Sequence, residues 1–444
     1  MTKNELVSVL EQKKFKALQE VLSCYNPVDI ASLLSELDKE QLVLVFRMIK
    51  KDKAAEVFSY MDNDMRQILI KSLADQEVTS LIDSMFADDA ADLLGDMPAN
   101  VVTHLLENVD KETRADINHL LNYPEDSAGS IMTVEFIELH PDMTVREALD
   151  KIRRVGIDSE TVYTCYVVDK RKLIGIVSAK DLMLNNDNTK IKEIMKDNFI
   201  SIKTTDDKED AANLFRKYGL IAIPTVDSEG CIVGIVTFDD AIDVLTDETT
   251  EDMQKMAAME ANDEPYLKTS VWKHAKHRIP WLLVLMLSAT ITGTIIANYE
   301  NAFAVMPLLV AFIPMLMDTG GNCGSQSSTL IIRGLAVDEL HFSDTLKIVW
   351  KEFRVALIVS IALALANGLK ILIMYKSIKL AILISLSLIG TIVIAKLVGC
   401  ILPIAAKFFK LDPAIMAAPL ITTIVDTFSI IIYFNIASAM FRFV

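Results

Sequence analysis

A carboxylate lies within an apolar stretch near the C-terminus, in the segment APLITTIVDTFSIII. Apolar runs flank Asp426 on both sides, and a charged side chain at the centre of a bilayer-spanning helix costs about 2.5–3.5 kcal/mol even on lenient insertion scales. Thr422 lies one helical turn before Asp426 on the same face, next to Thr423. Polar groups at membrane depth face partners or water, so the pattern indicates either hydrogen bonding between helices or a cation pathway.

A second polar pattern interrupts another apolar stretch, in PMLMDTGGNCGSQSSTLIIRG. Asp318, Asn322, Gln326 and Thr329 are three to four residues apart, which places them on one helical face. Gly320, Gly321 and Gly324 allow another helix or a hydrated ion to approach the backbone. Hydrogen bonding between helices would be a sufficient explanation if the pattern contained Thr and Asn residues only. It suits Asp426 poorly, because we expect no Lys or Arg in the nearby spans to neutralise it, so the pattern favours a cation pathway.

The ligand types narrow the choice of cation. Carboxylate, hydroxyl and amide oxygens suit hard cations, whereas transition metals favour His or Cys. Mg²⁺ keeps several of its waters and is commonly held by one or two carboxylates. The residues expected to line the pathway are Asp426, Thr422, Thr423, Asn322 and Gln326.

Five helices long enough to cross a bilayer are predicted to carry these residues. They are Pro280–Tyr299, Phe303–Ile332, Trp350–Tyr375, Leu380–Phe409 and Pro413–Phe441. The connections on the side of the N-terminal half are richer in Lys and Arg, as expected for a cytoplasmic side. We therefore predict a multi-pass protein of a bacterial-type plasma membrane, with cytoplasmic N-terminal domains and an external C-terminus.

The composition fits a soluble part joined to a membrane part. The 444 residues are 52% hydrophobic, yet 23% are charged and the net charge is −16. The N-terminus has no apolar core of signal-peptide length. Five scattered cysteines argue against a disulfide framework or a CxxC metal site. Neither a catalytic Ser/His/Asp or Cys/His constellation nor a phosphate-binding GxxxxGK[ST] loop occurs, so we expect no enzyme activity and no nucleic-acid partner.

The middle of the chain contains an internal repeat. IMTVEFIELHPDMTVREALDKIRR and IMKDNFISIKTTDDKEDAANLFRK each lead to a similar ending, LIGIVSAKDLM and IVGIVTFDDAI. These paired motifs resemble a tandem of CBS domains. In that family the Ser/Thr and Asp of the ending grip an adenosine ribose, and the matching positions are Ser178, Asp181, Thr237 and Asp240. The resemblance implies either ATP or another adenine nucleotide bound through Tyr163, Ser178 and Asp181, or a dimerisation module without nucleotide.

Acidic residues are concentrated on both sides of this repeat. Residues 1–129 read as short amphipathic helices that should stack into a superhelix, and FADDAADLLGD adds Asp88, Asp89, Asp92 and Asp96. After the repeat, a predicted helix contains many carboxylates and only Lys255 to oppose them. Like charges one turn apart are destabilising. The acidic residues of this helix are Asp240, Asp243, Asp247, Glu248, Glu251 and Asp252. Two such acidic surfaces repel each other without bound cations and come together when divalent ions bridge them. The sequence therefore predicts a sensor of divalent ions.

This order of parts closely resembles the MgtE family of magnesium channels over essentially the whole chain. The most specific segments are MDTGGNCGSQSSTLIIRGLA and DPAIMAAPLITTIVDTFSI. The resemblance implies a homodimer whose pore lies on the twofold axis between second and fifth spans. It also implies a pore role for Asp426, a position near the cytoplasmic mouth for Asp412, and gating-ion ligands at Asp240, Asp243, Glu248, Glu251 and Asp252. Asp89, Asp92 and Asp96 align loosely, and Ser429 stands where the family commonly has glycine.

We therefore predict a multidomain membrane protein with four parts. These are an N-terminal α-helical superhelix (1–129), a tandem CBS α+β pair (130–245), an acidic linker helix (246–270) and a five-helix transmembrane domain (271–444). The predicted function is influx of Mg²⁺ through a channel that cytoplasmic Mg²⁺ closes. The alternative is a CBS-regulated secondary transporter that exchanges a divalent cation for Na⁺ or H⁺.

Overall fold

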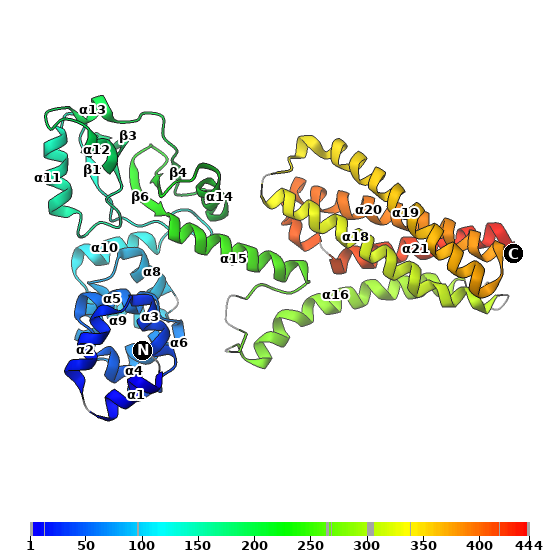
Figure 1. The fold of residues 1–444 in the computed structure, drawn as a ribbon, viewed down its shortest axis with the longest axis horizontal. Helices are drawn as coiled ribbons and strands as arrows, with labels where there is room; N and C mark the ends of the chain where they lie inside the picture. Colours follow the sequence, from blue (N-terminus) through cyan, green and yellow to red (C-terminus); the bar gives the residue numbers. More distant parts are fainter. Residues whose placement is uncertain are drawn as a thin grey trace. The chain divides into compact units, whose positions relative to one another are not determined.

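The computed structural model describes residues 3–12, 14–95, 97–262, 266–267, 269–299, 306–337, 339–416 and 418–441 (Figure 1). The chain divides into two compact units, Met1–Leu245 and Thr246–Val444. The first unit contains short helices and two small sheets, and the second contains long helices.

Short helices form the N-terminal part of the first unit. Asn26, Asp38, Asp62 and Asp110 each begin a helix by accepting a hydrogen bond from a backbone N–H of its first turn. Alternate helices pack on one another, α3 on α5, α5 on α7 and α7 on α9, which stacks the array and buries its apolar faces. The helices are α1 (Lys3–Glu11), α2 (Phe15–Cys24), α3 (Pro27–Ser35), α4 (Lys39–Phe46), α5 (Lys51–Ser59), α6 (Asn63–Ser72), α7 (Asp75–Ile82), α8 (Ala87–Gly95), α9 (Ala99–Asn108) and α10 (Lys111–Leu120).

Two three-stranded sheets follow, one for each predicted repeat. In each sheet the first strand pairs parallel with the second, and the second pairs antiparallel with the third. The first repeat comprises β1 (Glu138–Leu139), α11 (Val145–Val155), β2 (Thr164–Asp169), β3 (Lys172–Ser178) and α12 (Ala179–Leu184). After the short α13 (Ile191–Ile194), the second comprises β4 (Ile202–Lys203), α14 (Lys208–Tyr218), β5 (Ala222–Val226), β6 (Ile232–Thr237) and the start of α15 (Phe238–Met256). The predicted strand–helix–strand–strand–helix repeat is present twice.

The acidic helix α15 differs in its bounds from the predicted linker helix. It begins at Phe238, directly after β6, and ends at Met256, whereas residues 246–270 were expected. It therefore starts as the closing helix of the second repeat and continues past residue 245. Residues 257–262 form no helix. Their sequence, AAMEAN, carries no strong breaker, and the structural reason for the early end is the turn in which Ala258 adopts a positive φ of 54°.

Long helices make up the second unit. They are α16 (Val271–Ala297), α18 (Ile313–Ala336), α19 (Thr345–Tyr375), α20 (Ile378–Phe408) and α21 (Ala418–Phe441). The 3₁₀ turns η1 (Pro307–Phe312), η2 (Phe342–Asp344) and η3 (Pro413–Met416) precede α18, α19 and α21. Within the described ranges, four helical stretches are long and apolar enough to cross a membrane: Val271–Ala297, Phe342–Tyr375, Ile378–Phe408 and Pro413–Phe441. The second predicted span, Phe303–Ile332, is not among them; its first three residues lie outside the described part, and α18 carries several polar side chains.

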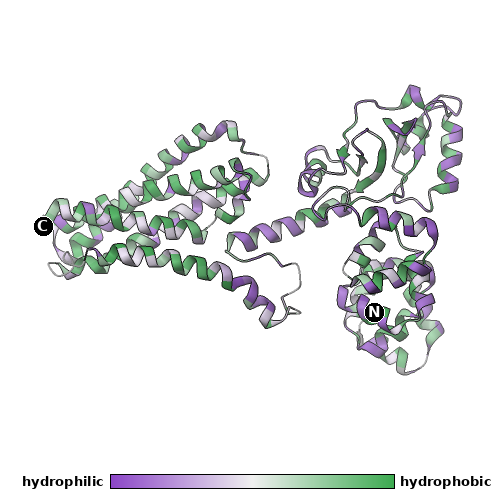
Figure 2. Ribbon diagram, turned by 180° about the vertical axis from the view of Figure 1, so that it is seen from behind, coloured by the Kyte–Doolittle hydropathy of each residue, from purple (hydrophilic) through white to green (hydrophobic). Residues whose placement is uncertain are grey.

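Close backbone contact joins α18 to its neighbours. A Cβ on Gly399 of α20 would lie 2.2 Å from the carbonyl oxygen of Gly324, so only glycine fits where these two helices meet. On the adjoining face of α18, Gly321 contacts Thr422 of α21. Figure 2 shows hydrophobic residues along the helices of this unit, and hydrophilic ones along α15. Within the unit, α18 packs against α20 and α21, while α19 packs against α20 and α16 against α21.

Candidate cation pathway and acidic cluster

The polar residues of α18 form one exposed stripe. Asp318, Asn322, Gln326 and Thr329 are all exposed, while the three glycines between them, together with Ser327 and Ser328, are buried. The predicted single face is therefore present. The face of α18 that packs against α20 and α21 is the opposite one.

Asp426 lies on α21, which packs against α18, and its side chain is partly buried. Asp318 is near enough for the two charges to interact. The hydroxyls of Thr422 and Thr423 each donate a hydrogen bond to the carbonyl oxygen of Pro419 at 2.9 Å. Their oxygens keep lone pairs that can accept from water or bind a cation. Asp426, the two threonines and the stripe thus lie on two adjacent helices, and the ligand atoms that these side chains offer a cation are oxygens.

Asp412 makes a contact that the sequence did not predict. Its carboxylate accepts from the Lys255 ammonium at 2.7 Å and from the backbone N–H of Ala414 at 2.8 Å. Lys255 also pairs with Glu251, one turn earlier on α15. Met256 packs beside it against Ile332 and Ala414. The C-terminal end of α15 is therefore held against the segment that leads into α21.

The remaining predicted residues of α15 differ in how far they are buried. Burial raises the pKa of Asp252, and the nearby Asp412 carboxylate raises it further. Asp243 and Asp247 are exposed, and Glu248 is half-buried. Among the described residues, no three His, Cys, Asp or Glu side chains are arranged to hold a metal ion as they stand. Any ion shared by these carboxylates would require them to move closer together.

A denser group of carboxylates lies inside the first unit, where α8 approaches the start of α15. Burial raises the pKa of Asp88 well above its usual range, and its Oδ1 is buried with no hydrogen-bond partner among the described residues. Burial also raises the pKa of Asp240 to about 7, and the charges of Asp239 and Asp89 add to the shift. Thr237 Oγ1 donates to Asp240 at 2.5 Å and partly opposes it. We call Asp88, Asp89, Glu160, Asp239 and Asp240 the acidic cluster.

The sequence predicted some of these acidic residues and missed others. Asp89 and Asp240 were predicted, and burial raises the pKa of Asp89. Asp92 is exposed on α8, and Asp96 lies outside the described residues. Glu160 was missed, although burial and the charges of Asp239 and Asp240 raise its pKa to about 7. It stands in a loop with no periodic pattern, so only the fold brings it to the cluster.

The predicted nucleotide residues surround the start of α12. Ser178 caps this helix, and its Oγ donates to Asp181 at 2.6 Å. That hydrogen bond lowers the pKa of Asp181, and Lys196, 3.6 Å from the carboxylate, lowers it further. The Tyr163 ring is exposed. The carboxylate, the cation and the free aromatic face are groups that a nucleotide can use.

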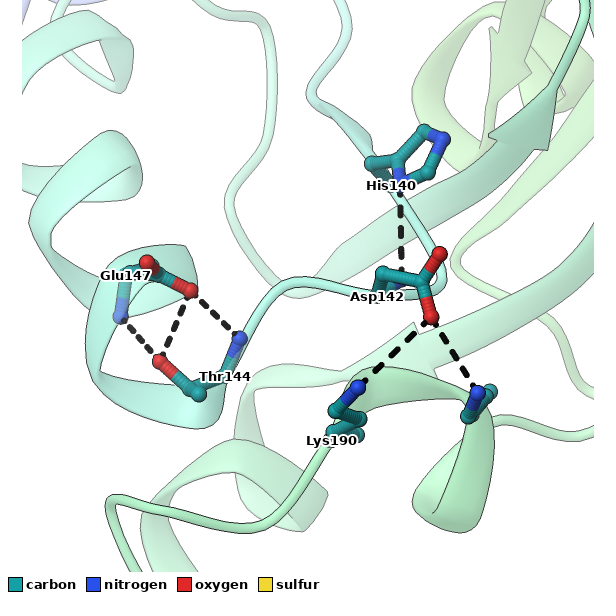
Figure 3. Close-up of polar contacts among 6 residues, drawn as sticks. His140, Asp142, Thr144, Glu147 and Lys190 are labelled. Carbon is teal, nitrogen blue, oxygen red and sulfur yellow. Dashed lines mark hydrogen bonds and ion pairs between the residues drawn. The ribbon is translucent and has the colours of Figure 1, made fainter.

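A separate cavity of about 630 Å³ opens beside α11 in the same repeat, lined by His140, Asp142, Met143, Glu147, Asp150, Lys151 and Arg154. Asp142 pairs with Lys192 at 3.1 Å and Lys190 at 3.8 Å, and Thr144 and Glu147 cap α11 reciprocally (Figure 3). None of the predicted nucleotide residues lines this cavity. Asp142, Asp150 and Lys151 instead pair with neighbouring residues of the repeat that lie outside the lining.

Comparison with known proteins assigns both parts of the chain. A sequence model described as "Divalent cation transporter" (MgtE) matches residues 313–436, the MgtE intracellular N domain matches 25–126, and CBS domains match 128–185 and 191–247. The Magnesium transporter MgtE of Thermus thermophilus is 34% identical over 97% of each chain, and that of Bacillus subtilis is 30% identical over 99% of this chain and 98% of its own.

Solved structures match the first unit. The cytosolic domain of the Mg²⁺ channel MgtE in complex with ATP is 36% identical, with a TM-score of 0.52, covering 55% of this chain and 99% of that one. The soluble part of a magnesium transporter is 28% identical, with a TM-score of 0.53, covering 55% and 97%. A helical array, a CBS pair and apolar helices with an oxygen-lined face define a membrane transport protein with a cytosolic N-terminal part, not an enzyme. The chain belongs to the MgtE family of magnesium transporters.

Proposed function

We propose that this protein is a homodimeric Mg²⁺ channel in which the stripe of α18 and Asp426 of α21 line the conduction path. The observation that carries the proposal is the exposed stripe on a helix whose other face is packed in the membrane unit. Lipid cannot satisfy such side chains, so water or protein must cover them. A second copy related by a twofold axis would bring two stripes and two Asp426 carboxylates around one water-filled path.

The ligand chemistry supports a hydrated Mg²⁺ as the conducted ion. Mg²⁺ releases its waters reluctantly, and amide, hydroxyl and carboxylate oxygens can bind that water shell without replacing it. Asn322, Gln326 and Thr422 supply the uncharged ligands, and Asp426 supplies charge. With cytoplasmic N-terminal domains and five spans, α18 included, the C-terminus would lie on the external face of the cell membrane.

Gating by cytoplasmic Mg²⁺ follows from the carboxylates on α8 and α15. Two unit charges 4 Å apart repel by about 4 kcal/mol at an effective dielectric constant of 20. Mg²⁺ bound between them offsets that repulsion, and a ligand stabilises whichever conformation offers it more bridging sites. The candidate ligands are Asp89, Asp92, Asp96, Asp240, Asp243, Asp247, Glu248, Glu251 and Asp252. The Lys255–Asp412 pair would carry closure of these carboxylates from α15 to the mouth of the path.

ATP or another adenine nucleotide is the proposed ligand of the first CBS repeat. The support is the exposed Tyr163 ring beside the Ser178–Asp181 pair, together with the ATP complex of a relative's cytosolic domain. Calorimetry with ATP should detect binding that Asp181→Ala weakens. Lack of binding at millimolar ATP would leave the pair as a dimerisation module.

The conduction path is tested by Asp426→Asn in proteoliposomes. We expect at least a roughly tenfold loss of Mg²⁺ influx, because one lost charge-assisted contact is worth more than about 1.4 kcal/mol. Asn435→Ala is the matched control, since Asn435 is an exposed polar residue of the same helix. Size-exclusion chromatography should show both variants with the wild-type dimer. Wild-type influx through Asp426→Asn would exclude this path.

A further inference from the structure

A charged pair lies buried inside the membrane unit, away from the proposed path. Glu352 on α19 is 9% exposed and Lys396 on α20 is 4% exposed. Ser327 on α18 bridges them, because its hydroxyl donates to Glu352 Oε2 at 2.7 Å and accepts from Lys396 Nζ at 3.1 Å. The two charged groups are themselves 3.7 Å apart. Three helices therefore meet in one hydrogen-bonded group, the Glu352–Ser327–Lys396 bridge.

Stability alone does not explain this bridge. Burying charges inside a membrane domain is costly, and apolar residues of similar volume often replace a buried ion pair without loss of stability. Buried polar groups in some proteins instead select one arrangement among several that pack equally well. Helices in lipid lack a hydrophobic force that would select one rotation about their own axes. A specific polar contact can supply that selection.

The position of Ser327 on α18 connects the bridge to the proposed path. At about 100° per residue, Ser327 is about 180° from Asp318 and about 140° from Asn322 around the helix. The bridge therefore contacts one side of α18, and the polar stripe lies on the opposite side. Since side-chain tips lie about 5–6 Å from the axis, a rotation of about 20° would move the stripe by about 2 Å. That displacement exceeds the tolerance of a site that must hold the water shell of one ion.

We propose that the Glu352–Ser327–Lys396 bridge is a positioning device that sets the rotation of α18 and so aims Asp318, Asn322 and Gln326 at the cation path. The inference rests on the proposed function, in which the stripe lines that path. None of the three residues touches the ion. They act through α18, and their effect appears in conductance and in discrimination between Mg²⁺ and monovalent cations.

The test removes both charges together, because loss of one would leave the other buried without a partner. In the double variant Glu352→Gln/Lys396→Met, we expect a folded dimer whose Mg²⁺ influx falls roughly tenfold, as for a misplaced site. Its Na⁺ leak relative to Mg²⁺ influx should rise. Lys370→Met is the matched control, since Lys370 is an exposed lysine of α19; it should keep wild-type influx and selectivity.

Rescue separates positioning from general stability. The charge exchange Glu352→Lys/Lys396→Glu keeps the pair, and the Ser327 hydroxyl can donate and accept in the opposite sense. It should recover most of the influx and the selectivity. If the exchange does not fold, Ser327→Ala replaces it as the test, because it keeps both charges and removes the bridge; it should shift selectivity in the same direction as the double neutral variant.

Wild-type influx and selectivity in the folded double variant would overturn the inference. So would unchanged selectivity in Ser327→Ala or a folded charge exchange that recovers neither property. Asp426→Asn, measured in parallel, separates this failure from failure of the proposed path. If Asp426→Asn loses influx while the bridge variants keep it, only the positioning role is wrong.

Discussion

At the scale of single residues, the acidic cluster holds carboxylates where burial disfavours their charged forms. Because the pKa of Asp240 and of Glu160 is raised to about 7, the folded protein binds more protons than the unfolded chain between their ordinary range and neutral pH. The free energy of unfolding therefore falls as pH rises through that window. Carboxyl groups with lowered pKa, such as Asp181, contribute their change at lower pH.

This predicts a pH-dependent stability without divalent ions. The melting temperature of a 1–262 fragment, followed by circular dichroism in EDTA, should fall between about pH 5 and pH 8. Asp240→Asn should flatten that slope by a few degrees, since 1 kcal/mol corresponds to about 2–4 °C in a unit of this size. Asp158→Asn, at an exposed site, is the control. A melting temperature that rises with pH, or an equal slope in Asp240→Asn, would show that burial of these carboxyl groups does not make stability fall with pH.

The positions and contacts of some residues could be predicted from the sequence, and those of others could not. The stripe of α18 was predictable, because residues three to four positions apart share a helical face. The Lys396–Glu352 pair was not, since its members stand on different helices with no spacing rule between them. The expectation that the nearby spans hold no basic residue to neutralise a buried acid overlooked Lys396, although the structure pairs it with Glu352 rather than Asp426.

At the scale of elements, α15 joins two environments. Its first turn contributes Asp239 and Asp240 to the acidic cluster, and its last turn contributes Lys255 to the pair with Asp412. Sequence pattern predicted an acidic helix here but not its bounds, because the ending of the second repeat runs into it without a break. The pairing of β4 with β5 could likewise be predicted only as part of a repeat, since β4 spans two residues.

The sensing role that we propose for α15 predicts an altered Mg²⁺ response in variants of its carboxylates. Neutralising three of its carboxylates, Glu248→Gln, Glu251→Gln and Asp252→Asn, removes ligands that favour the closed conformation. The Mg²⁺ concentration for half-closure should rise roughly tenfold, equivalent to about 1.4 kcal/mol of lost bridging energy. The soluble part should also become protease-sensitive at Mg²⁺ concentrations that protect the wild type.

A matched triple variant controls for lost negative charge. Glu36→Gln, Glu40→Gln and Glu107→Gln change three exposed carboxylates of the helical array and should leave the response unchanged. If the α15 variant closes at the wild-type Mg²⁺ concentration, its acidic face is only a solvated surface.

At the scale of the whole molecule, an acidic soluble unit and an apolar unit share one chain with a net charge of −16. Composition along the chain predicted a polar part followed by an apolar part; the second compact unit begins at Thr246 and therefore also contains the predicted acidic linker (246–270). The apolar pattern of the sequence predicted a span over Phe303–Ile332, whereas the described helix α18 alone is not among the stretches apolar enough to cross a membrane, since its polar residues make it less apolar than its neighbours. Its place among the long helices follows from packing against α20 and α21.

In the proposed channel, Mg²⁺ conduction is passive and driven by the membrane potential. Two charges crossing 100 mV gain about 4.6 kcal/mol, twice the figure for a single charge, so influx needs no other energy source. The most direct measurement is Mg²⁺ influx into proteoliposomes at a series of imposed inside-negative potentials, with no Na⁺ or H⁺ gradient and low Mg²⁺ on the side of the soluble domains. We predict influx that increases with potential and is lost in Asp426→Asn. Influx that appears only with an opposing Na⁺ or H⁺ gradient would contradict the channel and establish an exchanger.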